Sequence, residues 1–95
     1  MRTSEPKTIN VHRVPGTGLD VLEFKTDANG AAIPGLSVTL TNQSGDVVTT
    51  TRTREDGIAS LPVDASLQNS NPTVTISGYN VKPFQVQLNE VQISR

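Results

Sequence analysis

Few residue types in this 95-residue chain could carry out a chemical reaction. His12 is the single histidine, and no acidic residue lies close to it in the sequence. A Ser-His-Asp triad needs an acid that orients the imidazole. A zinc site needs several converging ligands, and the chain has no cysteine. We therefore expect His12 to be an exposed histidine of a strand, and we predict a protein that is not an enzyme and that holds no metal or cofactor.

The acidic residues lie mostly in segments that read as turns, including Asp27, Asp46 and Asp56. The sequence from Asp27 to Gly30, Asp-Ala-Asn-Gly, resembles the opening of a calcium-binding loop, but the later ligands and the terminal glutamate are missing. Asp, Asn and Gly are also the residues that tolerate the left-handed backbone of a hairpin turn. Turn formation explains these residues, and a weak calcium site between two loops is the alternative.

Three residues are candidates for contact with a partner: Arg52, Arg54 and Tyr79. The two arginines alternate with threonines, which could bind an anionic glycan or a partner protein, or could discourage edge-to-edge pairing of a strand. Tyr79 could stack on a sugar, or it could bury its ring and bond its hydroxyl to the backbone. Because the chain has only two other aromatic residues, both phenylalanines, we expect a core or corner tyrosine.

Composition and charge exclude several classes of partner. The 8 basic and 9 acidic residues are dispersed and give a net charge of −1, which argues against nucleic-acid binding. No run of apolar residues is long enough to span a bilayer, so no membrane insertion is expected. The first residues lack the apolar run of a signal peptide. We expect a domain of a longer exported chain, or a cytoplasmic protein if Met1 is its native start.

Alternating apolar and polar residues, with turn signals about every ten residues, predict an all-β protein. We expect an immunoglobulin-like or prealbumin-like antiparallel β-sandwich of seven or eight strands over residues 7–95, after a flexible lead-in at 1–6. Segment 64–72 is either a helical turn or a crossover between sheets. The strands expected are 8–14 at a sheet edge, 19–25, 36–41, 47–54, 58–63, 73–77, 84–88 and 91–93. The side chains expected to face inward are Leu22, Phe24, Val38, Leu40, Val74, Ile76, Val86 and Leu88.

These strands and turns resemble prealbumin-like modules of bacterial extracellular proteins. The sequence from Gly30 to Thr41 resembles the opening of a carboxypeptidase regulatory-like domain, and Thr53-Arg-Glu-Asp-Gly-Ile-Ala resembles the turn that follows in such modules. The sequence from Asn71 to Phe84 is similar to the end of the immunoglobulin-like domain of gingipain-type cysteine peptidases. The resemblance implies an accessory module that spaces, supports or displays a catalytic or adhesive neighbour.

The segment from Leu22 to Asp27 also resembles the B-type repeats of Gram-positive collagen adhesins. Some of those repeats join a first-strand lysine to a last-strand asparagine through an isopeptide bond beside a buried acid. Lys25 and Asn89 match the two ends, but the segment 73–77 carries no acid. We therefore expect no bond between them.

These observations favour a non-catalytic accessory module of a secreted or cell-surface bacterial protein, with a structural, spacer or adhesive role. Its partners would be neighbouring domains of a larger chain or another protein. One alternative is a carbohydrate-binding module that contacts a glycan. A second alternative is a small structural subunit of a phage or a secretion apparatus.

Overall fold

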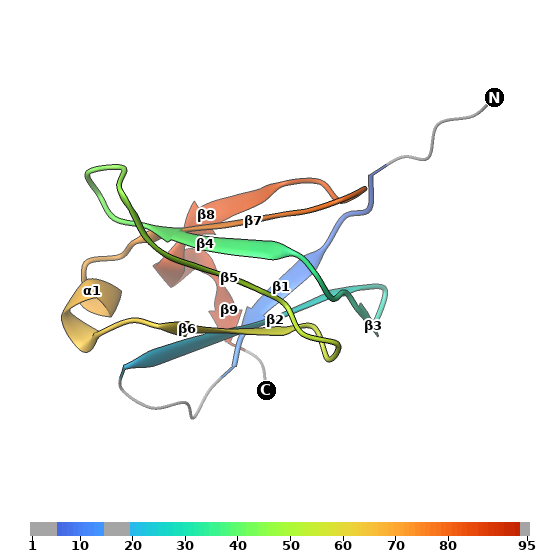
Figure 1. Ribbon diagram of the computed structural model, residues 1–95, viewed down its shortest axis with the longest axis horizontal. Helices are drawn as coiled ribbons and strands as arrows, with labels where there is room; N and C mark the ends of the chain where they lie inside the picture. The colour runs from blue at the N-terminus through green and yellow to red at the C-terminus, as the bar shows by residue number, and fades with distance from the viewer. Residues whose placement is uncertain (1–5, 15–19, 94–95) are drawn as a thin grey trace.

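The computed structural model describes residues 6–14 and 20–93 (Figure 1). The expected lead-in, apart from Pro6, and the turn expected at 15–18 lie outside the described residues. The described strands are β1 (Asn10–Arg13), β2 (Val21–Ala28), β3 (Ala31–Ala32), β4 (Ser37–Thr41), β5 (Val47–Arg52), β6 (Ile58–Pro62), β7 (Thr73–Ser77), β8 (Phe84–Gln87) and β9 (Gln92–Ile93). Two short helices, α1 (Ala65–Asn69) and the 3-10 helix η1 (Leu88–Glu90), complete the described elements.

Two sheets pack face to face as a β-sandwich, which confirms the predicted fold class (Figure 1). One sheet has the order β3-β2-β1-β9, with β6 also paired to β2, and the other has the order β5-β4-β7-β8. All strand pairs are antiparallel except β1 with β9. The edge position predicted for β1 is wrong, because Gln92 and Ile93 return beside His12 and Arg13 and cover its outer side.

Strand β2 runs three residues further than the pattern predicts and ends in a tight hairpin. Ala28 pairs with Ala31, so Asn29 and Gly30 form a two-residue turn. Both have positive φ, 55° and 86°, as a type I′ turn requires. This confirms the turn interpretation of the segment from Asp27 to Gly30, and Asp27 accepts a hydrogen bond from Asn10 at 3.1 Å.

The core lies between the two sheets and consists of aliphatic side chains and one phenylalanine. The predicted inward residues Leu22, Phe24, Val38, Leu40, Val74 and Ile76 are fully buried, and Leu88 is 4% exposed. Val86 faces the core but is half-buried, because β8 is the last strand of its sheet and its inner face is covered from one side only.

The sequence predicted either a helical turn or a crossover between the sheets at 64–72, and the structure has both. The segment joins β6 in one sheet to β7 in the other and contains the helical turn α1. Asp64 caps this turn, because its carboxylate accepts hydrogen bonds from the Leu67 N–H at 2.8 Å and the Ser66 hydroxyl at 3.0 Å. The hydrogen bond from the Leu67 backbone, followed by that from Ser66, lowers the pKa of Asp64 below its usual value.

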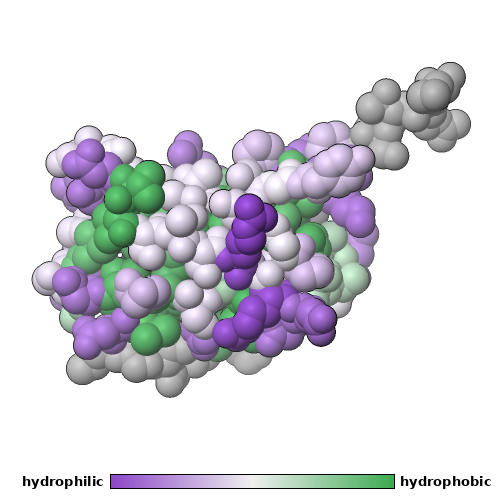
Figure 2. Space-filling view, viewed as in Figure 1, coloured by the Kyte–Doolittle hydropathy of each residue, from purple (hydrophilic) through white to green (hydrophobic). Residues whose placement is uncertain are grey.

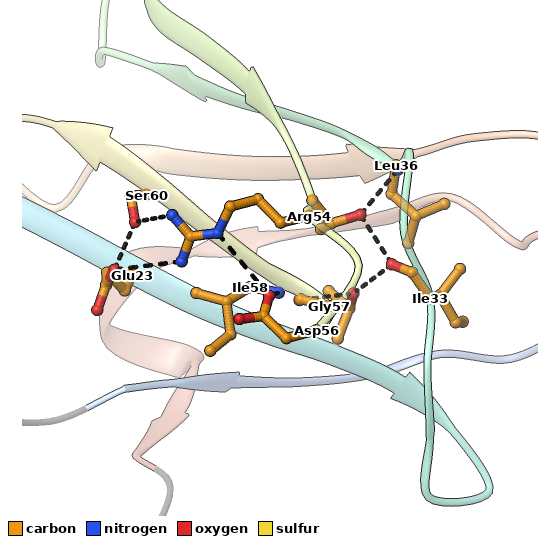
Figure 3. A network of polar contacts seen from close by, with 10 residues as sticks. Glu23, Ile33, Leu36, Arg54, Asp56, Gly57, Ile58 and Ser60 are labelled. Atoms are coloured by element: carbon orange, nitrogen blue, oxygen red, sulfur yellow. Dashed lines mark hydrogen bonds and ion pairs between the residues drawn. The ribbon is translucent and has the colours of Figure 1, made fainter.

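At one end of the sandwich, buried polar groups join the two sheets (Figure 3). The Thr53 hydroxyl accepts from the Leu36 N–H at 2.9 Å and donates to the Ile33 carbonyl at 2.7 Å. The Gly57 carbonyl accepts from the Thr26 N–H at 2.9 Å and from the Thr26 hydroxyl at 3.2 Å. We call these residues, 26, 33, 36, 53 and 57, the corner network. It fixes the point at which the chain leaves β5 in one sheet and enters β6 in the other.

The first prediction tests the register of β4. Leu40 is fully buried and Thr39 faces outward, so Leu40→Ala should lower the free energy of unfolding by about 2–5 kcal/mol. Thr39→Ala removes only one exposed hydroxyl contact and should cost about 1 kcal/mol or less. Urea unfolding followed by circular dichroism measures both. Equal losses would show that the two faces of β4 are exchanged.

The second prediction tests the corner network. A Cβ atom at Gly57 would lie 2.6 Å from the Thr26 carbonyl oxygen and 3.0 Å from the Ala32 Cβ. Gly45 has a similar positive φ, 89° against 79°, but its Cβ would meet nothing within 4 Å. Gly57→Ala should therefore destabilise the protein by about 1–3 kcal/mol more than the matched control Gly45→Ala, the usual cost of overpacking. Thermal unfolding midpoints that fall equally for both variants would contradict this.

Candidate functional site

The sheet β5-β4-β7-β8 presents an outward surface that the strand registers arrange in rows. Val47, Thr41, Thr73 and Gln87 form the first row across the four strands, and Thr50, Thr39, Thr75 and Gln85 form the second. Arg52, Ser37 and Ser77 form the third row. We call these eleven side chains the outer face. Seven of them carry hydroxyl groups, and Arg52 is the single charge among them.

Side-chain hydrogen bonds order the middle row of the outer face. The Thr39 and Thr50 hydroxyls lie 3.1 Å apart, and the Gln85 amide donates to the Thr75 hydroxyl at 3.1 Å. Residues on opposite strands that share a face interact directly, so these contacts align the polar groups along the row. The outer face is therefore an ordered, nearly uncharged surface of hydroxyl and amide groups.

The opposite sheet has a different outward surface. Its outward side chains on β1, β2 and β6 include Glu23, Lys25 and Asp27, and Arg54 extends over it from the β5–β6 turn. Charged side chains hold their hydration tightly and are costly to bury without partners. The two faces of the sandwich thus differ in what they can dock against, and the outer face is the candidate interaction surface.

The two arginines expected to contact a partner lie in different environments. Arg52 is exposed on the outer face, and its guanidinium reaches the Gly35 carbonyl at 3.5 Å. Arg54 turns to the other sheet, 3.9 Å from Glu23 and 3.8 Å from Asp56 (Figure 3). Ser60 joins this group, because its hydroxyl donates to Glu23 and accepts from Arg54. Both arginine side chains are exposed, and they lie on opposite faces: Arg54 beside the carboxylates of Glu23 and Asp56, and Arg52 on the outer face.

Tyr79 lies at the β7–β8 turn and is 97% exposed, so the expected core or corner position is wrong. Lys7 holds this turn in place, because its N–H donates a hydrogen bond to the Asn80 carbonyl at 2.9 Å. The buried side chain of this segment is that of Val81. The tyrosine ring is left in solvent. Arg52, Ser37 and Ser77 share a row, so Tyr79, two residues beyond Ser77, lies at the same end of the sheet as Arg52.

Apolar groups are also exposed at the opposite end of β5. Val47 and Val48 are 64% and 41% exposed, and a register shift between the Leu40–Thr49 and Thr41–Val47 pairs makes Val48 the extra residue of a β-bulge. Figure 2 shows a hydrophobic area at the left of its view, where Figure 1 places the β4–β5 hairpin. Among the described strands β5 pairs with β4 alone, so these valines lie beside an edge of the described sheet. A bulge disturbs the regularity that edge-to-edge pairing needs.

His12 does not form a catalytic arrangement in the described part of the chain. It is half-buried rather than exposed, and it lines a cavity of about 280 Å³ together with Phe84, Val86 and Glu90. No hydrogen bond or ion pair joins its imidazole to a carboxylate of the described residues. Those residues also contain no group of three or more His, Cys, Asp or Glu side chains able to hold a metal ion. None of their helices is long and apolar enough to cross a membrane.

The outer face also contains a hollow, at the end where Val47 and Thr41 lie. Its volume is about 350 Å³, and we call it the amide hollow because five of the eight residues that line it are Asn or Gln. The lining residues are Thr41, Asn42, Gln43, Gly45, Asn71, Thr73, Gln85 and Gln87. The sequence pattern did not predict this hollow, because its lining residues come from segments that lie far apart in the chain.

No model of a known protein family matches this chain, and no curated protein matches its sequence. Solved structures do match. The chain is similar to native α-2-macroglobulin from Escherichia coli spanning domains NIE-MG1, with a TM-score of 0.68 and 23% identity over 85% of this chain and 36% of that one. It is also similar to the complex of pro- and mature domains of RgpB from Porphyromonas gingivalis, with a TM-score of 0.64 and 23% identity over 94% of this chain and 19% of the other.

These similarities support an immunoglobulin-like β-sandwich, which agrees with the predicted likeness to gingipain-type domains. The more specific prealbumin-like assignment stays a prediction. The chain spans about a third of the length of the macroglobulin fragment and about a fifth of the gingipain chain. It therefore corresponds to one domain-sized part of larger multidomain chains.

The third prediction concerns the residues that match the ends of an isopeptide bond. Lys25 and Asn89 are both exposed. The bond needs a neutral lysine beside a protonated acid, and water stabilises the charged forms of both groups. Intact-mass spectrometry should give the full mass of the unmodified chain. A deficit of one ammonia that disappears in Lys25→Ala would contradict the prediction.

Proposed function

We propose that this chain is a non-catalytic interaction module of a larger secreted or cell-surface bacterial protein, and that its outer face packs against a neighbouring domain or another protein. The observation that carries the proposal is the difference between the two faces. The outer face has one charge among eleven side chains, whereas Glu23, Lys25, Asp27 and Arg54 surround the opposite face. The proposal gives His12 no catalytic role.

Physical chemistry favours docking on the outer face. Charged residues are depleted at the centre of protein interfaces, because each buried charge must find a partner. Serine and threonine side chains have few rotamers to lose on binding, in contrast to lysine and glutamate. The hydrogen bonds of the middle row already restrict Thr39, Thr50, Thr75 and Gln85. Burial of this face therefore costs less than burial of the charged one.

The fourth prediction tests docking on the outer face with one inserted charge. Thr75 lies in the middle row, so Thr75→Lys places a cation at the centre of the outer face. The matched control is Asn10→Lys on the outward side of the other sheet. In the natural polypeptide or assembly that carries this chain, Thr75→Lys should weaken the contact at least about tenfold, and Asn10→Lys should change it little.

Two measurements read out this test. Circular dichroism of each variant shows that the β-sandwich is retained. Carbene footprinting then compares the isolated chain with the natural polypeptide or assembly, and Thr39, Thr75 and Gln85 should lose labelling while Lys25 keeps it. Equal labelling of the outer face in both forms would refute the proposal.

A further inference from the structure

We infer that the amide hollow binds a neutral, polyhydroxylated ligand, namely a short stretch of an uncharged oligosaccharide. The inference goes beyond the proposed function and concerns a separate ligand at one end of the outer face. The hollow has about 350 Å³, which lies within the range of small-molecule sites. None of the described residues that line it is charged, so they offer no counter-charge to an ionic ligand.

Three of the amide side chains around the hollow are held by the backbone. The Asn42 Oδ1 accepts from the N–H groups of Ser44 and Asp46, each at 3.0 Å. The Gln43 Nε2 donates to the Ser70 carbonyl at 2.7 Å, and the Asn71 Oδ1 accepts from the Asn89 N–H at 2.9 Å. A backbone donor or acceptor settles which end of each amide is oxygen and which is nitrogen. These side chains are therefore fixed in both position and polarity.

Each fixed amide keeps its other end for a ligand. This polarity leaves the Asn42 and Asn71 amino groups as donors and the Gln43 oxygen as an acceptor. Gln85 adds a second acceptor, because its amino group is used by Thr75. A hydroxyl donates one hydrogen bond and accepts others. The hydroxyls of a sugar can therefore use both the donors and the acceptors that these side chains offer.

The position of the hollow favours a sugar over an extended peptide. Peptides that add to sheets bind through the backbone groups of an edge strand. The hollow lies over β4, β7 and the edge strand β8, which contributes Gln85 and Gln87. A peptide added to β8 would lie beside that strand in the plane of the sheet, whereas the hollow lies on the face of the sheet. β4 and β7 are each paired on both sides. Their backbone donors and acceptors are used in the ladders, so the groups that face the hollow from these strands are the side chains of Thr41 and Thr73. Side-chain hydroxyl and amide groups suit a ligand that is itself composed of hydroxyls.

Apolar contact is limited, which predicts weak binding. The lining that the described part of the chain provides contains no aromatic side chain. Val47 lies in the same row as Thr41 and is 64% exposed, so it can contact the C–H face of a sugar ring. An aliphatic contact of this kind is smaller than stacking on an aromatic ring. Because the amides are held before binding, little side-chain entropy is lost, and millimolar affinity is the expected range.

Nuclear magnetic resonance of the ¹⁵N-labelled 95-residue chain tests the inference directly. The probes are maltotriose, cellotriose and chitotriose, with trigalacturonate as the charged comparison and triglycine as the peptide comparison. The side-chain amide signals of Asn42, Gln43 and Asn71 report on the hollow itself. At least one neutral trisaccharide should shift these signals saturably, and Gln43→Ala combined with Gln85→Ala should weaken binding at least about tenfold. The control Asn69→Ala, an exposed amide of α1 outside the hollow, should bind as the parent chain does.

Three results would overturn the inference: no shift with any neutral trisaccharide, an unchanged affinity in the double variant, or shifts with triglycine or trigalacturonate alone. Circular dichroism of the double variant guards against a loss of fold. The outcome is separable from the proposed function. If Thr75→Lys disrupts the natural contact while no sugar binds, the ligand class is wrong and the docking face stands. If a sugar binds the hollow but Thr75→Lys leaves the natural contact intact, the docking face is wrong.

Discussion

The structure depends on the satisfaction of buried polar groups at the corner where β5 leaves one sheet and β6 enters the other. The Thr53 hydroxyl takes up both the Leu36 N–H and the Ile33 carbonyl, and Thr26 gives two hydrogen bonds to the Gly57 carbonyl. A buried backbone group without a partner would cost about 1–3 kcal/mol, a large share of the stability of a small domain. The corner network thus fixes the crossing between sheets, and a glycine at 57 is required by its contact with Thr26.

The registers that give the outer face its rows begin at this corner. β4 starts directly after Leu36 and β5 ends directly before Thr53, so one pair of residues sets the alignment of both strands. A slip of one residue would turn Thr39 and Thr41 inward and bring Val38 and Leu40 to the surface. The uncharged outer face and the buried aliphatic core are therefore two results of one constraint. The side chains of the outer face therefore form ordered rows only when the corner network has formed correctly.

The sequence predicted which side chains of a strand face inward, because local alternation controls their direction. It did not predict the neighbour of β1, the exposure of Tyr79 or the amide hollow, which depend on contacts between distant segments. Leu22, Phe24 and Leu40 face inward as expected, because a strand alternates its side chains whatever lies next to it. The position of β1 was misjudged, since no local signal indicates that residues near the C-terminus pair beside it. Tyr79 is exposed because Lys7 pins the turn from the other end of the chain. The amide hollow could not be predicted for the same reason, because its lining residues come from the separate segments 41–45, 71–73 and 85–87.

The polar contacts that stabilise the turns also explain how a site without an aromatic platform can be ordered. Asn42 closes its own turn, Gln43 joins the β4–β5 hairpin to the connection after α1, and Asn71 supports the start of η1. Each bond joins a solvent-exposed backbone group to a side chain that the folded loops bring beside it. The opposite end of each amide is then oriented without further cost. A ligand that needs fixed donors and acceptors would bind a surface whose order is already supplied by the folding of its loops.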